Sequence, residues 1–243
     1  SCAFLLTLFT LPRVRENSLK FGFYDEPDYR SSHKDIVPTF GGVAFYVVLL
    51  FTVFVSQGLD NTNLGLTLIF SISVMFFVGL KDDLQNLTLK MKLLGQFIAV
   101  GLLLSQPDFR VASLHGFLGI YQLPELISIV LSVFITLGII NAFNLIDGID
   151  GMASIVGIVI LSSFGVLFYN LGLLYYVAIC VSSVAMLIAF LRFNFSSRKK
   201  IFMGDTGALV LGLILGLMTM KLLSQGSNAF QMLAIGKGEI PLL

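Results

Sequence analysis

Residues 126–151 read LISIVLSVFITLGIINAFNLIDGIDG, in which fifteen uncharged, mostly apolar residues run directly into a segment that carries two Asn and two Asp. Together with small and polar flanking residues, such a run is long enough for a helix that crosses a bilayer. The two Asp-Gly pairs predict that the helix stops there, because glycine is a poor helix former. The polar residues should therefore lie where the helix meets the membrane surface.

The composition of the whole chain supports a membrane location. Of its 243 residues, 56% are hydrophobic and 12% are charged, and the mean hydropathy is +0.94. Soluble domains carry roughly 45–50% and 25%, so this chain has too few polar side chains to cover a soluble particle or to be disordered. Lys and Arg number 15 against 14 Asp and Glu, which excludes a nucleic-acid module built on a basic surface. Membrane lipid is the surrounding partner that we expect.

Apolar runs along the chain predict the spanning helices. There are seven such runs: residues 42–56, 64–80, 91–105, 126–140, 152–169, 171–191 and 208–223. Helices are favoured over a barrel, since a spanning backbone must satisfy its own hydrogen bonds and these runs do not alternate in polarity. The predicted fold is an all-α polytopic membrane helical bundle, with residues 1–243 forming a single integral membrane domain.

Both ends of the chain predict a fragment of a longer membrane protein. The chain starts at Ser1 without an initiator Met, and its first apolar run, residues 3–11, is too short to span. It stops at residues 240–243, which resemble the beginning of another span. We therefore expect about seven complete spans plus partial spans at both ends.

The distribution of charge predicts the orientation of the bundle. Twelve of the fifteen Lys and Arg residues fall in alternate loops, which predicts that these loops are cytoplasmic. The loops are residues 13–41, 81–92, 141–151 and 192–207. Ten of the fourteen acidic residues lie on the same side, although acidic residues contribute little to orientation. Their concentration at this membrane surface indicates a site.

The first candidate motif is residues 79–83, GLKDD, at the end of a predicted span. Adjacent carboxylates on a helix point roughly 100° apart, so Asp82 and Asp83 can approach one site in different ways. Each opposes ionisation of the other unless a cation is near. A solvated turn is the alternative interpretation.

The second motif is residues 141–151. Asn141, Asn144 and Asp147 are spaced i, i+3, i+6 and so form one stripe of a helix. The spacing does not match a calcium-binding loop, which needs further acids and a closing Glu. Helix capping by these polar side chains is the alternative interpretation.

The third motif is residues 202–207, FMGDTG, directly before the last predicted span. We expect Asp205 or Thr206 to serve as the helix N-cap, with the amides of the first turn directed at an anion. Capping alone is the alternative. Gly212 and Gly216 in the same span indicate close helix packing within the chain more than dimerisation.

Taken together, the motifs place carboxylates, amides and cations at one membrane surface. The oxygen ligands are Asp82, Asp83, Asn144, Asp147, Asp150 and Asp205, and the nearby cations are Lys92, Arg192, Lys199 and Lys200. Oxygen-rich clusters suit Mg²⁺ or Mn²⁺, not zinc, and Lys and Arg side chains can hold phosphate oxygens. This combination indicates phosphoryl-group chemistry on a lipid.

The motifs resemble those of the polyprenyl-phosphate N-acetylhexosamine-1-phosphate transferases, glycosyltransferase family 4, and in particular the bacterial undecaprenyl-phosphate GlcNAc-1-phosphate transferases. The matching segments follow one another in the family's order from about residue 22 to residue 223. They are residues 22–42, 79–83, 92–96, 141–151 and 201–207.

The resemblance implies transfer of a sugar-1-phosphate, most simply GlcNAc-1-phosphate, from a UDP-N-acetylhexosamine to undecaprenyl phosphate, with release of UMP. It also implies Mg²⁺ as cofactor, with Mn²⁺ as a substitute, and a place in the bacterial cytoplasmic membrane at the start of lipopolysaccharide or teichoic acid synthesis. By resemblance, Asn144 and Asp205 are metal ligands, and Asp82 and Asp83 are the catalytic aspartate pair. The implied substrate-binding residues are Lys34, Lys92, Asp147, Asp150, Asn194 and Gly204.

The chain departs from the family in one respect that bears on activity. The family's His-rich cytoplasmic motif has no counterpart among these residues, whose histidines are His33 and His115. We therefore expect this chain alone to show weak transferase activity or none. The alternatives are a phospho-MurNAc-pentapeptide translocase, a cation- or proton-coupled transporter and a non-catalytic assembly partner, and a homodimer is left open.

Overall fold

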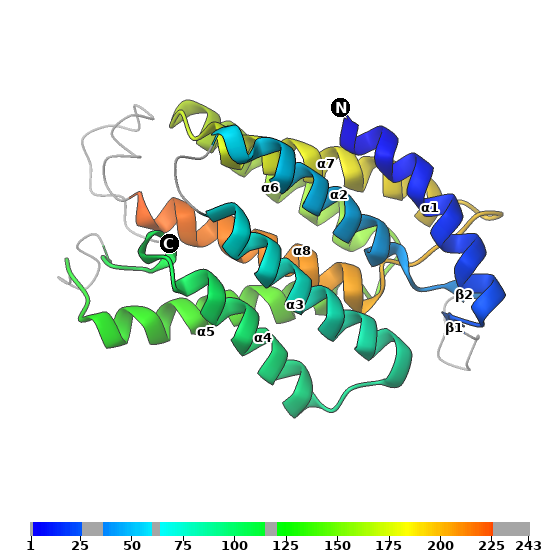
Figure 1. Ribbon diagram of the computed structural model, residues 1–243, viewed down its shortest axis with the longest axis horizontal. Coiled ribbons are helices and arrows are strands. Elements are labelled where there is room, and N and C mark those ends of the chain that lie inside the picture. Colours follow the sequence, from blue (N-terminus) through cyan, green and yellow to red (C-terminus); the bar gives the residue numbers. More distant parts are fainter. Residues whose placement is uncertain (1, 26–35, 60–63, 115–120, 226–243) are drawn as a thin grey trace.

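The computed structural model describes residues 2–25, 36–59, 64–114 and 121–225 of the chain (Figure 1). Long helices dominate, and short one-turn 3₁₀ helices, η1 (Gln57–Leu59) and η2 (Pro107–Phe109), lie at loop positions. The long helices are α1 (Cys2–Phe21), α2 (Gly41–Ser56), α3 (Leu64–Gln85), α4 (Leu89–Leu104), α5 (Glu125–Ile146), α6 (Met152–Asn170), α7 (Leu174–Asn194) and α8 (Gly204–Ser224). The chain is an all-α polytopic bundle, as its sequence predicts.

All seven predicted spans are helical, and within the described residues six helices are long and apolar enough to cross a membrane. α4 contains 16 residues and is shorter than the roughly 20 that a span usually needs. The apolar run at residues 3–11 forms the first half of α1, which continues through Pro12 for 20 residues into a polar second half and is not among the six. α7 begins three residues later than predicted, since Gly172 adopts a φ of 72° and forms a turn after α6.

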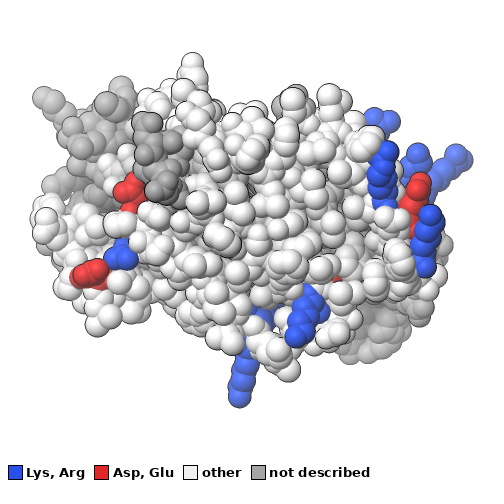
Figure 2. All heavy atoms as spheres, in the orientation of Figure 1, with Lys and Arg blue, Asp and Glu red and all other residues white. Residues whose placement is uncertain are grey.

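The helix ends and the charges define the two surfaces of the bundle. α2, α4, α6 and α8 begin, and α3, α5 and α7 end, at one end of the bundle, which we call the site end. Figure 2 shows uncharged surface over most of the visible face, with charged groups at its left end, at its right end and along the lower edge near the centre. Apolar helices with charges confined to their ends make this a multi-pass membrane protein.

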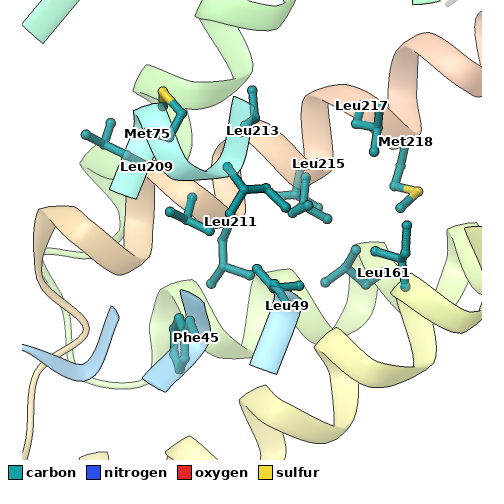
Figure 3. Packing of buried hydrophobic residues seen from close by; sticks show 14 of the residues in the cluster. Phe45, Leu49, Met75, Leu161, Leu209, Leu211, Leu213, Leu215, Leu217 and Met218 are labelled. Carbon is teal, nitrogen blue, oxygen red and sulfur yellow. The ribbon is translucent and has the colours of Figure 1, made fainter. Parts of the chain in front are cut away.

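α8 runs through the middle of the bundle and is buried on all sides. It packs against α2, α3, α5 and α6, and its leucines interdigitate with Phe45, Leu49 and Met75 (Figure 3). A Cβ at Gly212 would lie 2.8 Å from the Cα of Ile140, so this glycine lets α8 approach α5 closely. The prediction that the α8 glycines serve packing within the chain is confirmed.

A short antiparallel pair, β1 (Tyr24–Asp25) and β2 (Val37–Pro38), was not predicted. β2 and the residues after it run beside the segment that precedes α8. The Phe202 amide donates to the Pro38 carbonyl oxygen at 2.8 Å, and the amides of Gly41 and Gly42 donate to the carbonyl oxygens of Phe202 and Met203 at 3.0 and 2.9 Å. These bonds fix where α8 begins, and so they help to position the site.

Candidate functional site

Lys92 lies at the centre of a polar cluster at the site end. Its Nζ is 2.7 Å from Asp82 Oδ2 and 2.7 Å from Asp205 Oδ1. It also donates a hydrogen bond of 3.1 Å to Asn144 Oδ1. The four side chains come from α3, α4, α5 and α8, so the cluster joins four helices around one ammonium group. We call these four residues the Lys92 cluster.

The members of the Lys92 cluster also contact one another. Asn144 Nδ2 donates to Asp205 Oδ1 at 2.5 Å, so this oxygen accepts from both Asn144 and Lys92. The Lys92 side chain is 14% exposed and that of Asp205 is 34% exposed. The cluster is thus shielded on the protein side, where ion pairs are stronger than in water, and it remains open through Asp205.

Asp83 points away from the Lys92 cluster and caps α8. Its Oδ1 accepts from the amide of Asp205 at 2.8 Å, and its Oδ2 accepts from the amide and the hydroxyl of Thr206 at 3.0 and 2.5 Å. The predicted cap by Asp205 or Thr206 was wrong, because α8 begins at Gly204 and has no side-chain cap from the residue before it. A carboxylate from α3 satisfies the free amides of the first turn instead.

Two glycines make this contact sterically feasible. Gly204 has a φ of 72°, and a Cβ there would lie 2.2 Å from the Thr39 carbonyl oxygen and 2.8 Å from Asp83 Oδ2. A Cβ at Gly79 would lie 2.4 Å from the Cα of Thr206. Any side chain at either position would push α3 away from the N-terminus of α8.

The adjacent carboxylates diverge as their helical spacing predicts. Asp82 binds Lys92 and accepts a hydrogen bond of 2.7 Å from the Leu87 amide, which follows the end of α3. Asp83 binds the first turn of α8. The aspartate pair therefore holds two different parts of the site in place.

The residues after α5 form a second acidic group beside the Lys92 cluster. Asp147 is half-buried, and this burial, followed by the negative charges of Asp205, Asp83 and Asp150, raises its pKa to about 8. Asp150 forms an ion pair with Lys200 at 2.5 Å. The loop thus places one carboxyl group that resists ionisation and one that is already paired.

Asn194 ends α7 in a buried position near the same loop. Its Nδ2 donates to the Ile201 carbonyl oxygen at 3.1 Å, while its Oδ1 is buried and has no hydrogen-bond partner within the part of the chain that the structure describes. Gly151, with a φ of 73°, packs so closely on Phe195 that a Cβ would lie 2.2 Å from the ring. The 147–151 loop is therefore fixed against the end of α7.

The structure accounts for most of the residues that the sequence singled out. Asp82, Lys92, Asn144 and Asp205 meet directly, and Asp83 and Gly204 lie beside them at the start of α8. Asp147, Asp150 and Asn194 lie around the adjoining loop, and Lys34 lies outside the described residues. Gln96 and Asn141 were not among the predicted site residues, although Asn141 was placed on the polar stripe with Asn144; they bind each other one turn farther from the site end. A glutamine four residues after Lys92 in an apolar run was the available signal.

The donor atoms fit a magnesium ion that is only partly held by protein. Among the described residues no group of three or more His, Cys, Asp or Glu side chains could enclose a metal. Asn144 and Asp205 nevertheless place an amide and a carboxylate oxygen around one positively charged atom, Lys92 Nζ. Mg²⁺ prefers such oxygens and is commonly bound by one or two carboxylates together with substrate phosphates.

The comparison with known protein families agrees with this geometry. The model of the family described as "Glycosyl transferase family 4" matches residues 65–223, which include the whole Lys92 cluster. The chain belongs to glycosyl transferase family 4. Its recognition from the sequence motifs is confirmed.

Individual relatives in this family carry two kinds of name. A phospho-N-acetylmuramoyl-pentapeptide-transferase of Clostridium perfringens is 33% identical over 81% of this chain and 64% of its own length. A probable undecaprenyl-phosphate N-acetylglucosaminyl 1-phosphate transferase of Bacillus subtilis is 29% identical over 90% of this chain and 62% of its own length. A phospho-N-acetylmuramoyl-pentapeptide-transferase of Staphylococcus carnosus is 31% identical over 94% and 77%. The chain thus spans less than two thirds of the first two relatives.

Proposed function

We propose that this chain transfers an N-acetylhexosamine-1-phosphate, in the first instance GlcNAc-1-phosphate, from a UDP-sugar to undecaprenyl phosphate and releases UMP. The observation that carries the proposal is the Lys92 cluster, a shielded ammonium ringed by oxygen ligands at the end of a membrane helix bundle. The names of relatives supply the polyprenyl phosphate acceptor. The cell location would be the bacterial cytoplasmic membrane, with the site end toward the cytoplasm because the positively charged loops belong to that side.

The reaction that we propose is a single displacement at phosphorus. An oxygen of the lipid phosphate attacks the sugar-linked phosphorus of the UDP-sugar, and the bond from that phosphorus to the bridging oxygen breaks. The electron pair leaves with the bridging oxygen as UMP, and the product is a polyprenyl diphosphate-linked sugar. Because the attacking lipid phosphate is an anion, it needs little help from a general base, and the main difficulty is to bring two anions together.

Lys92 is the residue that we assign to the donor pyrophosphate. Its ammonium is pre-positioned by Asp82 on one side and by Asn144 and Asp205 on the other. A positive charge that is already oriented needs no rearrangement when charge develops on the departing phosphate. Asp82 thus acts on the reaction through Lys92, and Asp83 acts through the first turn of α8, which carries Asp205.

Asn144 and Asp205 are the residues that we assign to Mg²⁺, with Mn²⁺ as a substitute. When bound, the ion would neutralise oxygens of the donor pyrophosphate. The chain's own contribution is to hold Asn144 to Asp205 by the hydrogen bond from Asn144 Nδ2 to Asp205 Oδ1 and to fix the start of α8 through Asp83. A mispositioned Asp205 would therefore weaken both the metal site and the hold on Lys92.

The nucleotide is assigned to the loop after α5 and the end of α7, with Lys34 as a further contact. Asn194 is assigned by its place at the end of α7 beside this loop, where its buried Oδ1 has no hydrogen-bond partner among the described residues. Asp150 holds Lys200 beside the same loop, and Gly204 allows Thr39 and Asp83 to pack closely against the start of α8. These contacts would orient the donor so that UMP departs opposite the incoming lipid phosphate.

The names of the relatives differ in the sugar that is transferred. GlcNAc-1-phosphate is the substrate favoured by the sequence motifs, and transfer would then begin a lipopolysaccharide or teichoic acid type of polymer. The second candidate is phospho-MurNAc-pentapeptide, which is favoured by the name of the 33% identical Clostridium perfringens relative. A cation- or proton-coupled transporter is not favoured, because the described acidic residues lie at helix ends and not at mid-bundle depth.

The test is a transfer assay on this chain in membranes, with undecaprenyl phosphate and either UDP-GlcNAc or UDP-MurNAc-pentapeptide. We expect UMP release and a labelled lipid with UDP-GlcNAc, weak because these residues have no counterpart of the His-rich motif, abolished by EDTA and restored by Mg²⁺. Release with UDP-MurNAc-pentapeptide alone would select the second candidate. Absence of release with both donors, while each nucleotide still binds, would favour a non-catalytic assembly role.

A further inference from the structure

Gln96 on α4 and Asn141 on α5 bind each other through both of their amide groups. Gln96 Nε2 donates to Asn141 Oδ1 at 3.2 Å, and Asn141 Nδ2 donates to Gln96 Oε1 at 2.9 Å. Asn141 Nδ2 also donates to the Leu137 carbonyl oxygen at 2.8 Å, which fixes the orientation of its amide. Gln96 has no exposed surface. Each amide therefore satisfies hydrogen-bonding groups of the other that would otherwise be unpaired in an apolar environment.

The register of this pair relates it directly to the Lys92 cluster. Gln96 lies one turn after Lys92, and Asn141 lies one turn before Asn144, so each pair shares one face of its helix. Lys92 Nζ donates to Asn144 Oδ1 at 3.1 Å. Because α4 and α5 run in opposite directions, the two contacts are successive crosslinks between the same two helix faces.

The Gln96–Asn141 contact restrains the position of α4 relative to α5, which the Lys92–Asn144 contact alone does not. Lys92 reaches its partners through a long side chain with four rotatable bonds, so the position of its backbone is not set by those contacts alone. α4 has only 16 residues, as α2 does, and the Thr88 side chain makes no capping hydrogen bond at its start. A paired amide has fewer rotatable bonds and two donor–acceptor contacts, and so it fixes both the rotation and the height of α4 relative to α5.

We infer that Gln96 and Asn141 are positioning residues, and that their amide pair holds α4 against α5 so that the Lys92 ammonium meets Asn144 and Asp205. The inference rests on the proposed function in one respect, which is the role of Lys92 at the donor pyrophosphate. Neither amide touches the reacting atoms. The pair lies one helical turn farther from the site end and acts by fixing the backbone position of Lys92.

The variants are chosen to stretch the pair without placing an apolar side chain beside a buried amide. Gln96→Asn keeps the amide but shortens its reach by one methylene. The double variant Gln96→Asn with Asn141→Gln returns that methylene on the opposite helix. Tyr46→Phe is the matched control, because it removes a 3.0 Å hydrogen bond between α2 and α3, from Tyr46 to Ser73, and leaves the Lys92 cluster intact.

The first readout is transfer kinetics. We expect Gln96→Asn to lower kcat about 10- to 100-fold, the size of effect that a misplacement of about 1 Å produces. The double variant should recover most of this loss, and Tyr46→Phe should retain wild-type kcat. Thermal midpoints in detergent are measured in parallel, and we expect Gln96→Asn and Tyr46→Phe to lower them by similar amounts, since each loses one interhelical contact.

The second readout reports the position of Lys92 without any turnover. A small amine-reactive ester is added to the full chain, and acylation of each lysine is followed by mass spectrometry. Lys92, held by two carboxylates, should react slowly in the wild type, faster in Gln96→Asn and slowly again in the double variant. The exposed Lys90, two residues away, is the internal reference and should react equally in all four proteins.

The two readouts separate failure of the inference from failure of the proposed function. Equal Lys92 acylation in the wild type and Gln96→Asn, or no recovery in the double variant, would overturn the positioning role whatever the activity. A wild-type chain that transfers no sugar but shows the expected acylation pattern would overturn the proposed function and leave the amide pair as the element that positions Lys92. A variant that fails to fold is identified by its thermal midpoint. The double variant then tests the positioning role, through the recovery of wild-type kcat and slow Lys92 acylation or the lack of it.

Discussion

Asp83 accepts two hydrogen bonds from Thr206, one from its amide at 3.0 Å and one from its hydroxyl at 2.5 Å. The two residues are 123 positions apart in the chain. The end of α3 is thereby attached to the beginning of α8, the helix around which the bundle packs. A residue expected to act in catalysis is thus also the cap of the central helix.

The first prediction concerns this cap. Asp83→Ala should lower the free energy of unfolding by about 1–3 kcal/mol, because two amides and a hydroxyl in the first turn of α8 lose their acceptor. Thr206→Val should have a smaller effect of the same sign, since one of the three hydrogen bonds is lost. Thr206→Ser keeps the hydroxyl and serves as the control. Thermal unfolding in detergent gives the order, and an Asp83→Ala protein as stable as Thr206→Ser would contradict the capping role.

The second prediction compares the ligands of the Lys92 cluster. Asp205→Ala and Asn144→Ala should each lower transfer about 10²- to 10³-fold, the range seen when a group that stabilises transition-state charge is removed. Asp82→Asn should lower it less, because it keeps an oxygen for Lys92 and because the lipid phosphate needs little base catalysis. The measurement is a radiolabelled lipid-transfer assay. A loss for Asp82→Asn in the 10²–10⁴-fold range of a general base would instead assign that role to Asp82.

The third prediction concerns pH and Asp147. Its pKa rises from an ordinary value of 3.8 to about 8 in the folded protein, through burial first and then through the charges of Asp205, Asp83 and Asp150. The folded state therefore holds this proton more tightly than the unfolded state, so the associated stability is complete below pH 3.8 and is lost as the pH rises through 8. Asp147→Asn should raise the thermal midpoint at pH 8.5 in EDTA and change it little at pH 4. An equal effect at both pH values would show that the titration of Asp147 is not the cause.

The fourth prediction separates stability from function at the opposite end of the bundle. Lys221 is 6% exposed, lies 2.8 Å from Asp108 Oδ2 and packs over the rings of Phe109 and Tyr176. Asp108→Asn should destabilise the fold by about 1 kcal/mol, since a shielded ammonium loses its carboxylate while Asp108 itself is largely exposed. Transfer activity per folded molecule should be unchanged. Thermal unfolding and the transfer assay on the same preparation check both parts, and Glu125→Gln, at the exposed pair with Arg110, is the matched control.

Features that depend on local sequence were predictable. Apolar runs located the spans, and the Asp-Gly pairs located the end of α5, because both depend on neighbouring residues only. The divergence of Asp82 and Asp83 follows from helix geometry. The continuation of α1 past Pro12 was not foreseen, since a proline and a charged half interrupt an apolar pattern even where the backbone remains helical.

Features that depend on contacts between distant helices were not predictable from local patterns. The cap of α8 was sought within residues 205–206, where capping rules apply, but the acceptor comes from α3. The Gln96–Asn141 pair needs the relative height of α4 and α5, which no single span encodes. The motifs named the participants of the site, and packing decided which of them touch.

The burial of α8 has a consequence for biosynthesis. α8 is the last of the eight long helices described, yet α2, α3, α5 and α6 all pack around it. Those four helices are therefore synthesised before α8, the helix against which they pack. Because Asp205 and Thr206 belong to α8, neither the ion pair with Lys92 nor the contact with Asp83 can form until this helix inserts. A chain whose synthesis stopped before Gly204 would contain α1 to α7 without the helix that fills the centre of the bundle.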